Sequence, residues 1–398
     1  MKKTLTLVAA LLMTFAVSAQ EGFDFTTVKE NPITSVKNQA SSGTCWCFSA
    51  LSFIESEIIR QNPKAAEGID LSEMFIVSKA YTDKAVKYIR TDGHVNYAQG
   101  SSFGDVFHVL RDYGVCPDSE MPGLNYGTKK HSHSEMAAGL KGYVQAILGS
   151  LSRKGATLST AWLDGLKGIL EAYLGPEPEK FTVNGKEYTP KSYFDSFGLN
   201  LNDYVDITSW THLSYYCEHP VEVADNWRWE TAYNLPLDEM MEVIDKAIND
   251  GYTVAWAADV SEPGFTRKGA CVGVIPTPEA VKQAKEPGSD AAKWLGITPG
   301  STKYEIKGPV DEIEVTPESR QKGYDEKSTT DDHGMQIYGI AKDRTGKKYY
   351  MVKNSWGTDH DYKGIWYVSE AYVKAKTMDI TVHKNCLPKA VAKKMGIK

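Results

Sequence analysis

The chain has 398 residues, of which 41% are hydrophobic and 24% are charged, a composition typical of a globular protein. This length suits two lobes, or one domain with a large insertion. The formal net charge is -6 and no basic run stands out, so the usual electrostatic basis for binding nucleic acid is excluded.

Residues 1–19 are typical of a secretory signal segment. A pair of lysines precedes an apolar run, Leu5 to Val17, that is too short to cross a bilayer, and a small-residue cleavage site ends at Ala19. No cysteine follows this site and no later stretch is apolar enough to enter a membrane, so we predict no membrane anchor. We expect an exported, soluble protein, and the style of the segment indicates a bacterial periplasm.

Helical patterns dominate residues 20–120. Apolar residues at helical spacing predict a helix that begins at or near Cys45, and Ser72 is placed to cap a second helix. The spacing over 106–113 predicts a third helix, which Gly114 closes. We assign 20–120 to a helical lobe.

Residues 121–250 are predicted to be a mostly helical insertion. Helical patterns span 137–151, 158–174 and 237–249, and polar, aromatic stretches lie between them.

Strand patterns dominate residues 251–398. A buried run at 253–259 is followed by a polar stretch, 262–330, that is rich in Pro and Gly and in which Thr277 can cap a short helix. Further strand patterns lie at 335–341, 348–353, 364–368 and 379–382. Helices first and strands later predict an α+β fold whose two lobes face each other.

Two distant parts of the chain carry residues suited to nucleophilic catalysis. Cys45 lies at a helix N-terminus, where free N–H groups and the helix dipole favour a thiolate, and Gln39 offers an amide toward whatever Cys45 attacks. His333 opens one predicted strand and Asn354 follows the next, so a turn between the strands makes them neighbours. A cysteine nucleophile needs such a base, and the base needs a third group to fix its tautomer. Trp356 can cover the Asn–His bond and exclude water.

Each of these residues alone has an ordinary structural explanation, because free cysteines are mostly buried and an Asn before Trp is usually in a turn. Their coincidence favours catalysis. The run from His131 to Glu135 alternates possible metal ligands, but the adjoining lysines favour a solvated linker. We predict no metal ion and no cofactor.

Sequence motifs around these residues resemble the papain-type cysteine peptidases, and within them the bleomycin hydrolase or aminopeptidase C family. The run Ser42-Gly43-Thr44-Cys45-Trp46 is similar to the papain signature, except that Ser42 replaces a cysteine, as in the bleomycin hydrolase branch. Asn354-Ser355-Trp356-Gly357 is similar to the end of that branch. The Cys-to-His gap is about twice the papain value, which the insertion explains.

The resemblance implies a papain-like fold, a peptide substrate and a role for each residue. Cys45 would be the nucleophile, His333 the general base and acid, and Asn354 the residue that orients His333. Gln39 and the Cys45 backbone N–H would form the oxyanion hole. The resemblance also suggests a ring-shaped, hexamer-like homo-oligomer.

The C-terminal part of the chain departs from the family. There, a C-terminal arm lies in the substrate cleft and its carboxylate meets the substrate's free amine, which makes the enzyme an aminopeptidase. Here few residues follow the last match, so the arm looks short. The insertion or the 262–330 stretch would then have to block the cleft.

The sequence therefore favours an exported cysteine aminopeptidase and leaves two alternatives open. One is a papain-like endopeptidase or dipeptidyl peptidase with an open cleft. The other is a non-catalytic peptide-binding protein of the same fold. We expect the six cysteines to be mostly reduced and buried rather than joined in a disulfide framework.

Overall fold

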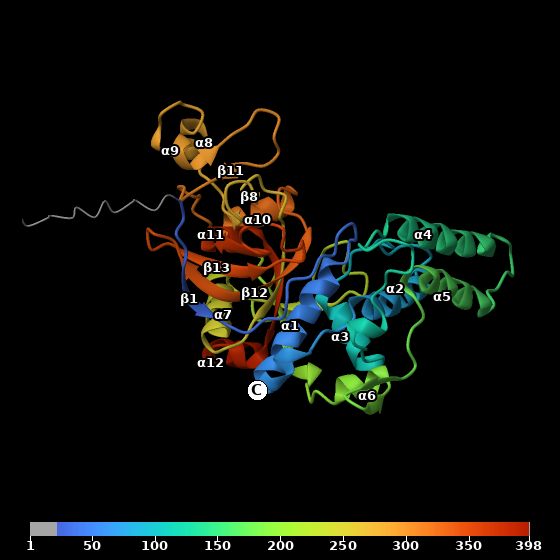
Figure 1. Cartoon of the computed structure of the whole chain (residues 1–398). Coiled ribbons are helices and arrows are strands. Elements are labelled where there is room, and N and C mark those ends of the chain that lie inside the picture. The colour runs from blue at the N-terminus through green and yellow to red at the C-terminus, as the bar shows by residue number, and fades with distance from the viewer. Residues whose placement is uncertain (1–21, 398) are drawn as a thin grey trace, which may run out of the picture.

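A computed structural model describes residues 22–397 of the chain (Figure 1). The predicted signal segment, residues 1–19, lies outside the described residues. The predicted α+β class is confirmed, because helices and one large sheet both build the molecule.

The helices surround the sheet and extend away from it on one side (Figure 1). They are α1 (Cys45–Gln61), α2 (Glu73–Arg90), α3 (Phe103–Asp112), α4 (Ser134–Gly149), α5 (Ala161–Leu174), α6 (Pro190–Asp195), α7 (Leu237–Asn249), α8 (Pro278–Gln283), α9 (Asp290–Trp294), α10 (Pro317–Asp325), α11 (Glu370–Lys376) and α12 (Lys389–Met395).

In the described residues, eleven strands form one mixed sheet, in the order β5-β6-β4-β15-β7-β12-β13-β14-β9-β8, with β1 pairing to β12. The strands are β1 (Thr26–Glu30), β4 (Tyr204–Thr208), β5 (Glu218–Pro220), β6 (Thr231–Asn234), β7 (Val254–Ala258), β8 (Phe265–Thr266), β9 (Val272–Gly273), β12 (His333–Lys342), β13 (Lys348–Lys353), β14 (Ile365–Ser369) and β15 (Thr377–His383). Two small hairpins stand apart, β2 (Phe181–Val183) with β3 (Lys186–Tyr188), and β10 (Leu295–Gly296) with β11 (Glu305–Ile306).

The predicted helices of the first lobe are present, and capping residues mark two of their ends. Ser72 accepts a hydrogen bond from the Phe75 backbone N–H at 3.0 Å and so caps α2. Gly114 follows α3 with φ of +80°, a conformation that glycine adopts at little cost. Helices α1, α2 and α3 bury their apolar faces in one shared core cluster with α4 and α5.

The insertion contains more strand than the sequence pattern indicates. Helices α4, α5 and α7 confirm the three predicted helices, but residues 204–234 add β4, β5 and β6 to the main sheet. The prediction of a mostly helical insertion is incomplete there, because short strands are fixed by their partners. The partner of β4 is β15, which is far away in the sequence.

Buried polar side chains join the two lobes. Gln336 on β12 is fully buried, accepts a hydrogen bond from Ser52 Oγ on α1 at 2.7 Å and donates to Ser56 Oγ at 2.8 Å. Lys353, which lies opposite Gln336 in the sheet, donates to Ser52 Oγ at 2.6 Å. Because β12 begins at His333 and β13 ends at Lys353, these bonds to the middle of α1 fix the helix relative to both strands.

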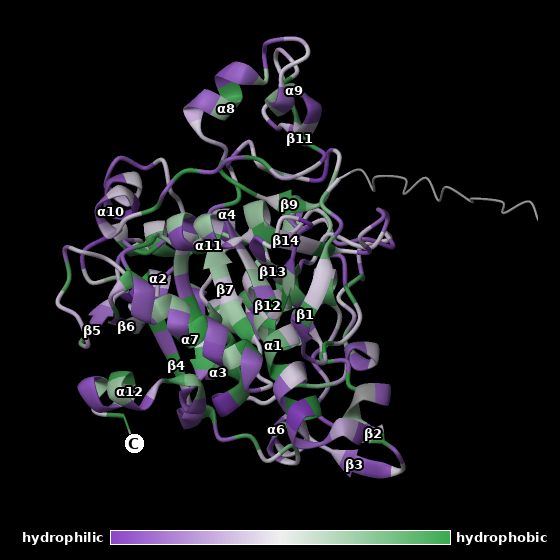
Figure 2. Cartoon of the chain, turned by 90° about the vertical axis from the view of Figure 1, so that its left-hand side faces the viewer, coloured by the Kyte–Doolittle hydropathy of each residue, from purple (hydrophilic) through white to green (hydrophobic). Residues whose placement is uncertain are grey.

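Hydrophobic residues gather where α1 meets the central strands β7 and β12 (Figure 2). Helices α8 and α9, within the stretch predicted to be polar, project beyond the sheet (Figure 1). Thr277 caps α8 as predicted, accepting from the Ala280 backbone N–H at 3.1 Å.

The six cysteines are free, as expected, and only Cys217 is exposed. None of the described helices combines the length and the apolar character that a membrane span requires.

Candidate active site

Cys45 is the first residue of α1. The first amides of a helix have no acceptor within the helix, so the N–H groups of Cys45 and Trp46 are free of the helical hydrogen-bond ladder. No acidic side chain lies in the first turn of α1. Negative charge that develops at this end is therefore stabilised by the helix and opposed by no carboxylate of the helix itself.

Gln39 lies beside this helix start in a tightly fixed loop. Its Nε2 donates to the Ser42 carbonyl oxygen at 2.7 Å, and its Oε1 accepts from Ser355 Oγ at 2.5 Å. Its backbone N–H also donates to the Ser355 carbonyl oxygen at 2.9 Å. Within residues 22–397, the second N–H of the Gln39 amide has no acceptor. The loop that holds Gln39 is thus attached to the strand end that carries Asn354.

His333 and Asn354 are neighbours, as predicted. His333 Nε2 lies 2.8 Å from Asn354 Oδ1, and that oxygen also accepts from the Ser355 backbone N–H at 2.7 Å. Since the amide oxygen can only accept, Nε2 carries the proton and Nδ1 keeps a free lone pair. The indole of Trp356 stacks on the imidazole, with ring centroids 4.6 Å apart, and shields the bond from water.

Cys45 and His333 line the same cleft. Among the described residues, the Cys45 sulfur makes no hydrogen bond to the imidazole and instead faces the backbone amide of Gly334. Burial raises the pKa of the Cys45 thiol to about 11, and the nearby charges of Asp331 and Asp225 add to that rise. Burial lowers the pKa of His333 to about 4, against the opposing effect of Asn354. Burial thus favours a neutral thiol and a neutral imidazole in the absence of substrate.

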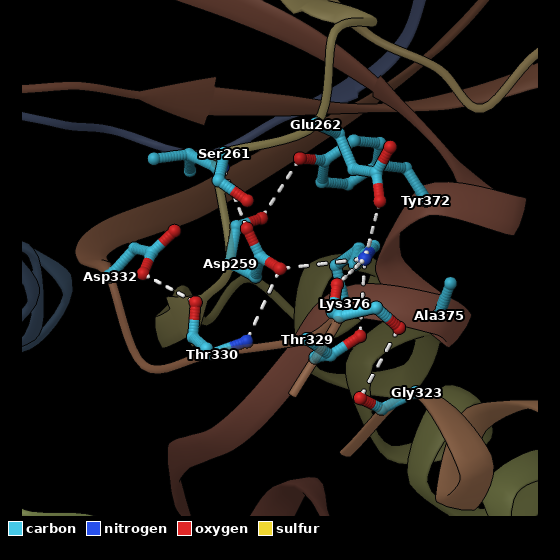
Figure 3. Close-up of polar contacts among 12 residues, drawn as sticks. Asp259, Ser261, Glu262, Gly323, Thr329, Thr330, Asp332, Tyr372, Ala375 and Lys376 are labelled. Carbon is cyan, nitrogen blue, oxygen red and sulfur yellow. Dashed lines mark hydrogen bonds and ion pairs between the residues drawn. The ribbon is translucent and has the colours of Figure 1, made fainter. Parts of the chain in front are cut away.

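The loop that leads into His333 is held by Asp259 at the end of β7 (Figure 3). Asp259 is fully buried and accepts from the backbone N–H groups of Ser261 at 2.7 Å and Thr330 at 3.2 Å. Lys376 lies 3.4 Å from its carboxylate and also donates to the Ser328 carbonyl oxygen at 2.7 Å. Asp259 does not line the cleft; it is a structural residue that positions the 328–332 loop.

One wall of the cleft is the loop of residues 99–105, which precedes and begins α3. Gln99 attaches this loop to the start of α1, because its Oε1 accepts from the Gly43 backbone N–H at 2.8 Å and its carbonyl oxygen accepts from Trp46 Nε1 at 3.0 Å. Gly100, Ser101 and Ser102 all line the cleft. The wall therefore has a fixed position relative to Cys45.

Residues 221–231, the connection between β5 and β6 with the first residue of β6, cross from the edge of the sheet to this wall. An ideal Cβ at Gly100 would lie 1.7 Å from Asp225 Oδ2, so the carboxylate rests directly on the Gly100 backbone. The other oxygen of Asp225 accepts from Asn96 Nδ2 at 2.8 Å. The sequence pattern does not identify Asp225 as a site residue, since nothing local indicates that this segment reaches the cleft.

Further contacts hold the 221–231 segment in place. Trp227 is buried and donates from Nε1 to Ser101 Oγ at 3.0 Å. Arg228 pairs with Asp105 at 2.6 Å and stacks over the Trp227 ring at 4.2 Å. These buried and charge-assisted contacts hold the segment in a fixed position as part of the cleft wall.

The stretch from His131 to Glu135 is not the solvated linker that the sequence predicts. His133 is fully buried, and burial lowers its pKa to about 4. The centroid of its ring lies 5.6 Å from that of the His131 ring. His133 is also the residue that directly precedes α4. Across residues 22–397, no group of three or more His, Cys, Asp and Glu side chains could hold a metal ion.

Comparisons with known proteins bear on both ends of the chain. A model described as "Papain family cysteine protease" matches residues 19–145, and one described as "Peptidase C1-like family" matches residues 288–397. Aminopeptidase C of Streptococcus thermophilus is 22% identical over 391 residues, which cover 88% of this chain and 81% of the relative. Aminopeptidase G of Lactobacillus delbrueckii subsp. lactis is 22% identical over 402 residues, which cover 90% and 83%. The crystal structure of PepW from Lactobacillus rhamnosis HN001 is 19% identical, with a TM-score of 0.67 over 93% of this chain and 84% of that one, and shows the same fold.

Proposed function

This chain belongs to the papain-like cysteine peptidases, in the family of bleomycin hydrolase and aminopeptidase C, and from that premise we propose that it releases N-terminal residues from peptides. The curated relatives that it resembles over most of its length are named aminopeptidases. The observation that carries the proposal is the position of Asp225, which rests on Gly100 and lines the same cleft as Cys45.

In the mechanism that we propose, the Cys45 thiol gives its proton to Nδ1 of His333, and the thiolate attacks the carbonyl carbon of the first peptide bond. The Cys45 backbone N–H and the free N–H of Gln39 stabilise the resulting oxyanion. When the intermediate collapses, the imidazolium gives its proton to the leaving amine and a thioester remains. Water, deprotonated by His333, then hydrolyses the thioester and restores the thiol.

The proton transfer must create both charges together, because burial opposes each of them alone. Two unit charges about 4 Å apart attract each other by about 4 kcal/mol at an effective dielectric constant of about 20. The N-terminus of α1 adds about 1 kcal/mol in favour of the thiolate. Asn354 stabilises the imidazolium by accepting its Nε2 proton.

In this proposal, the 221–231 segment limits how many residues can precede the scissile bond. A peptidase that cleaves within a chain must accommodate several residues before the scissile bond. The 221–231 segment, held by Trp227 and Arg228, lines the cleft beside Cys45, and we infer that it takes the space that such residues would need. A substrate whose chain begins close to the scissile bond avoids this steric conflict.

Matched fluorogenic amides test the proposal. We expect cleavage of alanyl-aminomethylcoumarin and loss of cleavage when its amine is acetylated. Cleavage of acetylated peptides at a similar rate would instead support an endopeptidase, and cleavage only of two-residue amides would support a dipeptidyl peptidase. The Cys45→Ala variant is the blank, and failure of iodoacetamide to label Cys45 in the intact protein would favour a non-catalytic binding protein.

We also propose that the protein is exported, on the basis of the signal-like pattern of residues 1–19. Cell fractionation with an N-terminal sequence of the exported form would test this, since export predicts cleavage after Ala19. Recovery of the full-length chain from the cytoplasm would contradict it. The ring-shaped homo-oligomer suggested by the family resemblance stays a prediction that light scattering can test.

A further inference from the structure

We propose that Asp225 and Asp331 bind the α-ammonium group of the peptide substrate, an inference that rests on the proposed aminopeptidase function. Internal carboxylates, one from the insertion and one from the loop before His333, would thus define the end of the substrate. The inference depends on the charge of the cleft, on the position of both side chains and on which of them lacks a partner.

The cleft is strongly acidic. Its lining includes six carboxylates and no lysine or arginine: Asp206, Asp225, Glu230, Asp331, Asp332 and Asp379. Carboxylates in a partly enclosed site repel one another unless a cation joins them. A cationic ligand is therefore the chemistry that this lining complements.

Most of these carboxylates already have a partner within the protein. Thr381 donates to Asp206, His108 pairs with Glu230 at 2.7 Å, and Thr330 donates to Asp332 at 2.8 Å. The carboxylates of Asp379 and Asp331, in contrast, make no hydrogen bond or ion pair with any residue in the described part of the chain. Of these two, Asp331 is the one that lies two residues before His333. Burial raises its pKa to about 7, and the charges of Asp225 and Asp332 contribute. A partly buried carboxylate without a partner is only partly solvated, and a bound cation would compensate its charge.

Asp225 and Asp331 are also close enough to the nucleophile for their charges to act on it. Both raise the pKa of the Cys45 thiol, and Asp225 raises that of Asp331. Asp331 precedes His333 by two residues on the loop that Asp259 fixes. Asp225 is fixed from the other side, by Asn96 and by the contact with Gly100. The two carboxylates therefore flank the space next to the reacting atoms.

The α-ammonium group is the cation that reaches this space in an N-terminal residue. It is two bonds from the scissile carbonyl carbon, so a group that binds it must lie near Cys45. Asp379 is farther away: it pairs across the sheet with Ala257, which pairs with Gly334, and two strand spacings amount to about 10 Å. Asp379 is thus better placed for a longer substrate side chain than for the α-ammonium group.

The test compares two substrates that differ only in the amine. Alanyl-aminomethylcoumarin carries the ammonium group, and propionyl-aminomethylcoumarin is the same compound with hydrogen in its place. We expect Asp225→Asn and Asp331→Asn each to reduce the ratio of the two kcat/KM values by about 10-fold or more, the usual value of a charged hydrogen bond. The rate on the propionyl compound should not fall in either variant, because removing either carboxylate also removes a charge that opposes the Cys45 thiolate. Asp206→Asn, which removes a satisfied carboxylate from the same cleft, is the matched control and should keep the wild-type ratio.

The outcomes separate this inference from the proposed function. If the wild-type protein cleaves both compounds equally, the aminopeptidase proposal fails. If it prefers the alanyl compound and both variants keep that preference, the aminopeptidase stands and the assignment of Asp225 and Asp331 is wrong. A ratio that falls equally in Asp206→Asn would reduce the effect to overall charge and also overturn the assignment.

Two other effects must be separated from recognition of the ammonium group: partial unfolding of a variant, and binding of a substrate side chain. The ratio of the two kcat/KM values is independent of the fraction of folded enzyme, so partial unfolding cannot imitate the expected result. Asp225→Glu, which keeps the charge, should restore part of the ratio.

A lysine or arginine side chain of the substrate is the other source of a cation. Cleavage of an acetylated arginyl-alanyl amide that is lost in Asp331→Asn would assign the site to a side chain and contradict the inference.

Discussion

Asp225 of the insertion rests on the backbone of Gly100 so closely that a methyl group at Gly100 would lie 1.7 Å from its carboxylate oxygen. The contact joins a connection at the edge of the sheet to the wall of the cleft in the helical lobe. It places a steric barrier and a negative charge at one point. A peptide that continues past this point meets the barrier, whereas one that begins there presents an ammonium group to the charge.

Gly100→Ala should convert part of the activity from exopeptidase to endopeptidase. The new methyl group displaces the Asp225 carboxylate from the wall, so we expect cleavage of acetylated peptides to appear and cleavage of alanyl-aminomethylcoumarin to fall by roughly 10-fold. Gly139→Ala is the matched control, because a Cβ at Gly139 on α4 meets open space. If Gly100→Ala left both rates unchanged, the 221–231 segment would not limit the substrate.

Removing the charge of Asp331 should make Cys45 more reactive when no substrate is bound. The carboxylates of Asp331 and Asp225 raise the pKa of the thiol, so Asp331→Asn should lower it. The rate of alkylation by iodoacetamide, measured against pH, should then rise at a lower pH than in the wild-type protein. An unchanged or higher midpoint would show that Asp331 lies too far from the sulfur to act on it. The same reasoning implies that a bound ammonium group promotes the thiolate by neutralising these carboxylates.

The sequence predicted the contacts among His333, Asn354 and Trp356 better than it predicted the strands that surround the cleft. The contact of His333 with Asn354 and the stacking of Trp356 on His333 follow from residue type, spacing and the strand pattern, all of which are local. The helix start at Cys45 is equally local. Strands β4, β5 and β6 were missed, because their stability comes from pairing with distant partners such as β15.

The acidic lining could be predicted only in part. Asp331 directly precedes the Asp-His pair, so its presence near His333 was visible in the sequence. Asp379 interrupts a strand pattern of buried residues, which is a recognisable sign of a functional position. Asp225 gave no such sign, since its role depends on the tertiary docking of Trp227 and Arg228.

Cys45→Ala should abolish turnover and leave the thermal midpoint within about 2 °C of the wild-type value, because the residue is partly exposed and fills little of the core. Cys47→Ala is the informative contrast. Cys47 is fully buried in the same helix and its thiol donates to the Glu73 carbonyl oxygen at 3.4 Å, so this variant should lose stability and keep activity. Measured turnover in Cys45→Ala would exclude the cysteine mechanism.

Asp331 should also make stability depend on pH. Its pKa in the folded state, about 7, is above the value of about 4 for an unfolded Asp. Between these values the unfolded chain loses a proton that the folded protein keeps, so the free energy of unfolding falls as pH rises from about 4 to 7. In urea titrations, the stability of Asp331→Asn relative to the wild-type protein should therefore be greater at pH 8 than at pH 4. Asp238→Asn, on the exposed surface, is the control. A difference that is the same at both pH values would contradict the raised pKa.

Lys376→Met should destabilise the protein by about 3–5 kcal/mol, because it leaves the buried carboxylate of Asp259 without its cation. The 328–332 loop also loses the bond from Lys376 to the Ser328 carbonyl oxygen, so His333 should be less well positioned and kcat should fall. Lys374→Met is the matched control two residues away on the same helix. Its ion pair with Glu370 is partly exposed and is worth about 1 kcal/mol or less. Urea unfolding of both variants measures the difference, and equal losses would mean that the Asp259 network does not hold the loop. The double variant Lys376→Met/Asp259→Asn should recover part of the stability, since it removes the unpaired charge, and this coupling distinguishes the charge effect from a simple loss of packing.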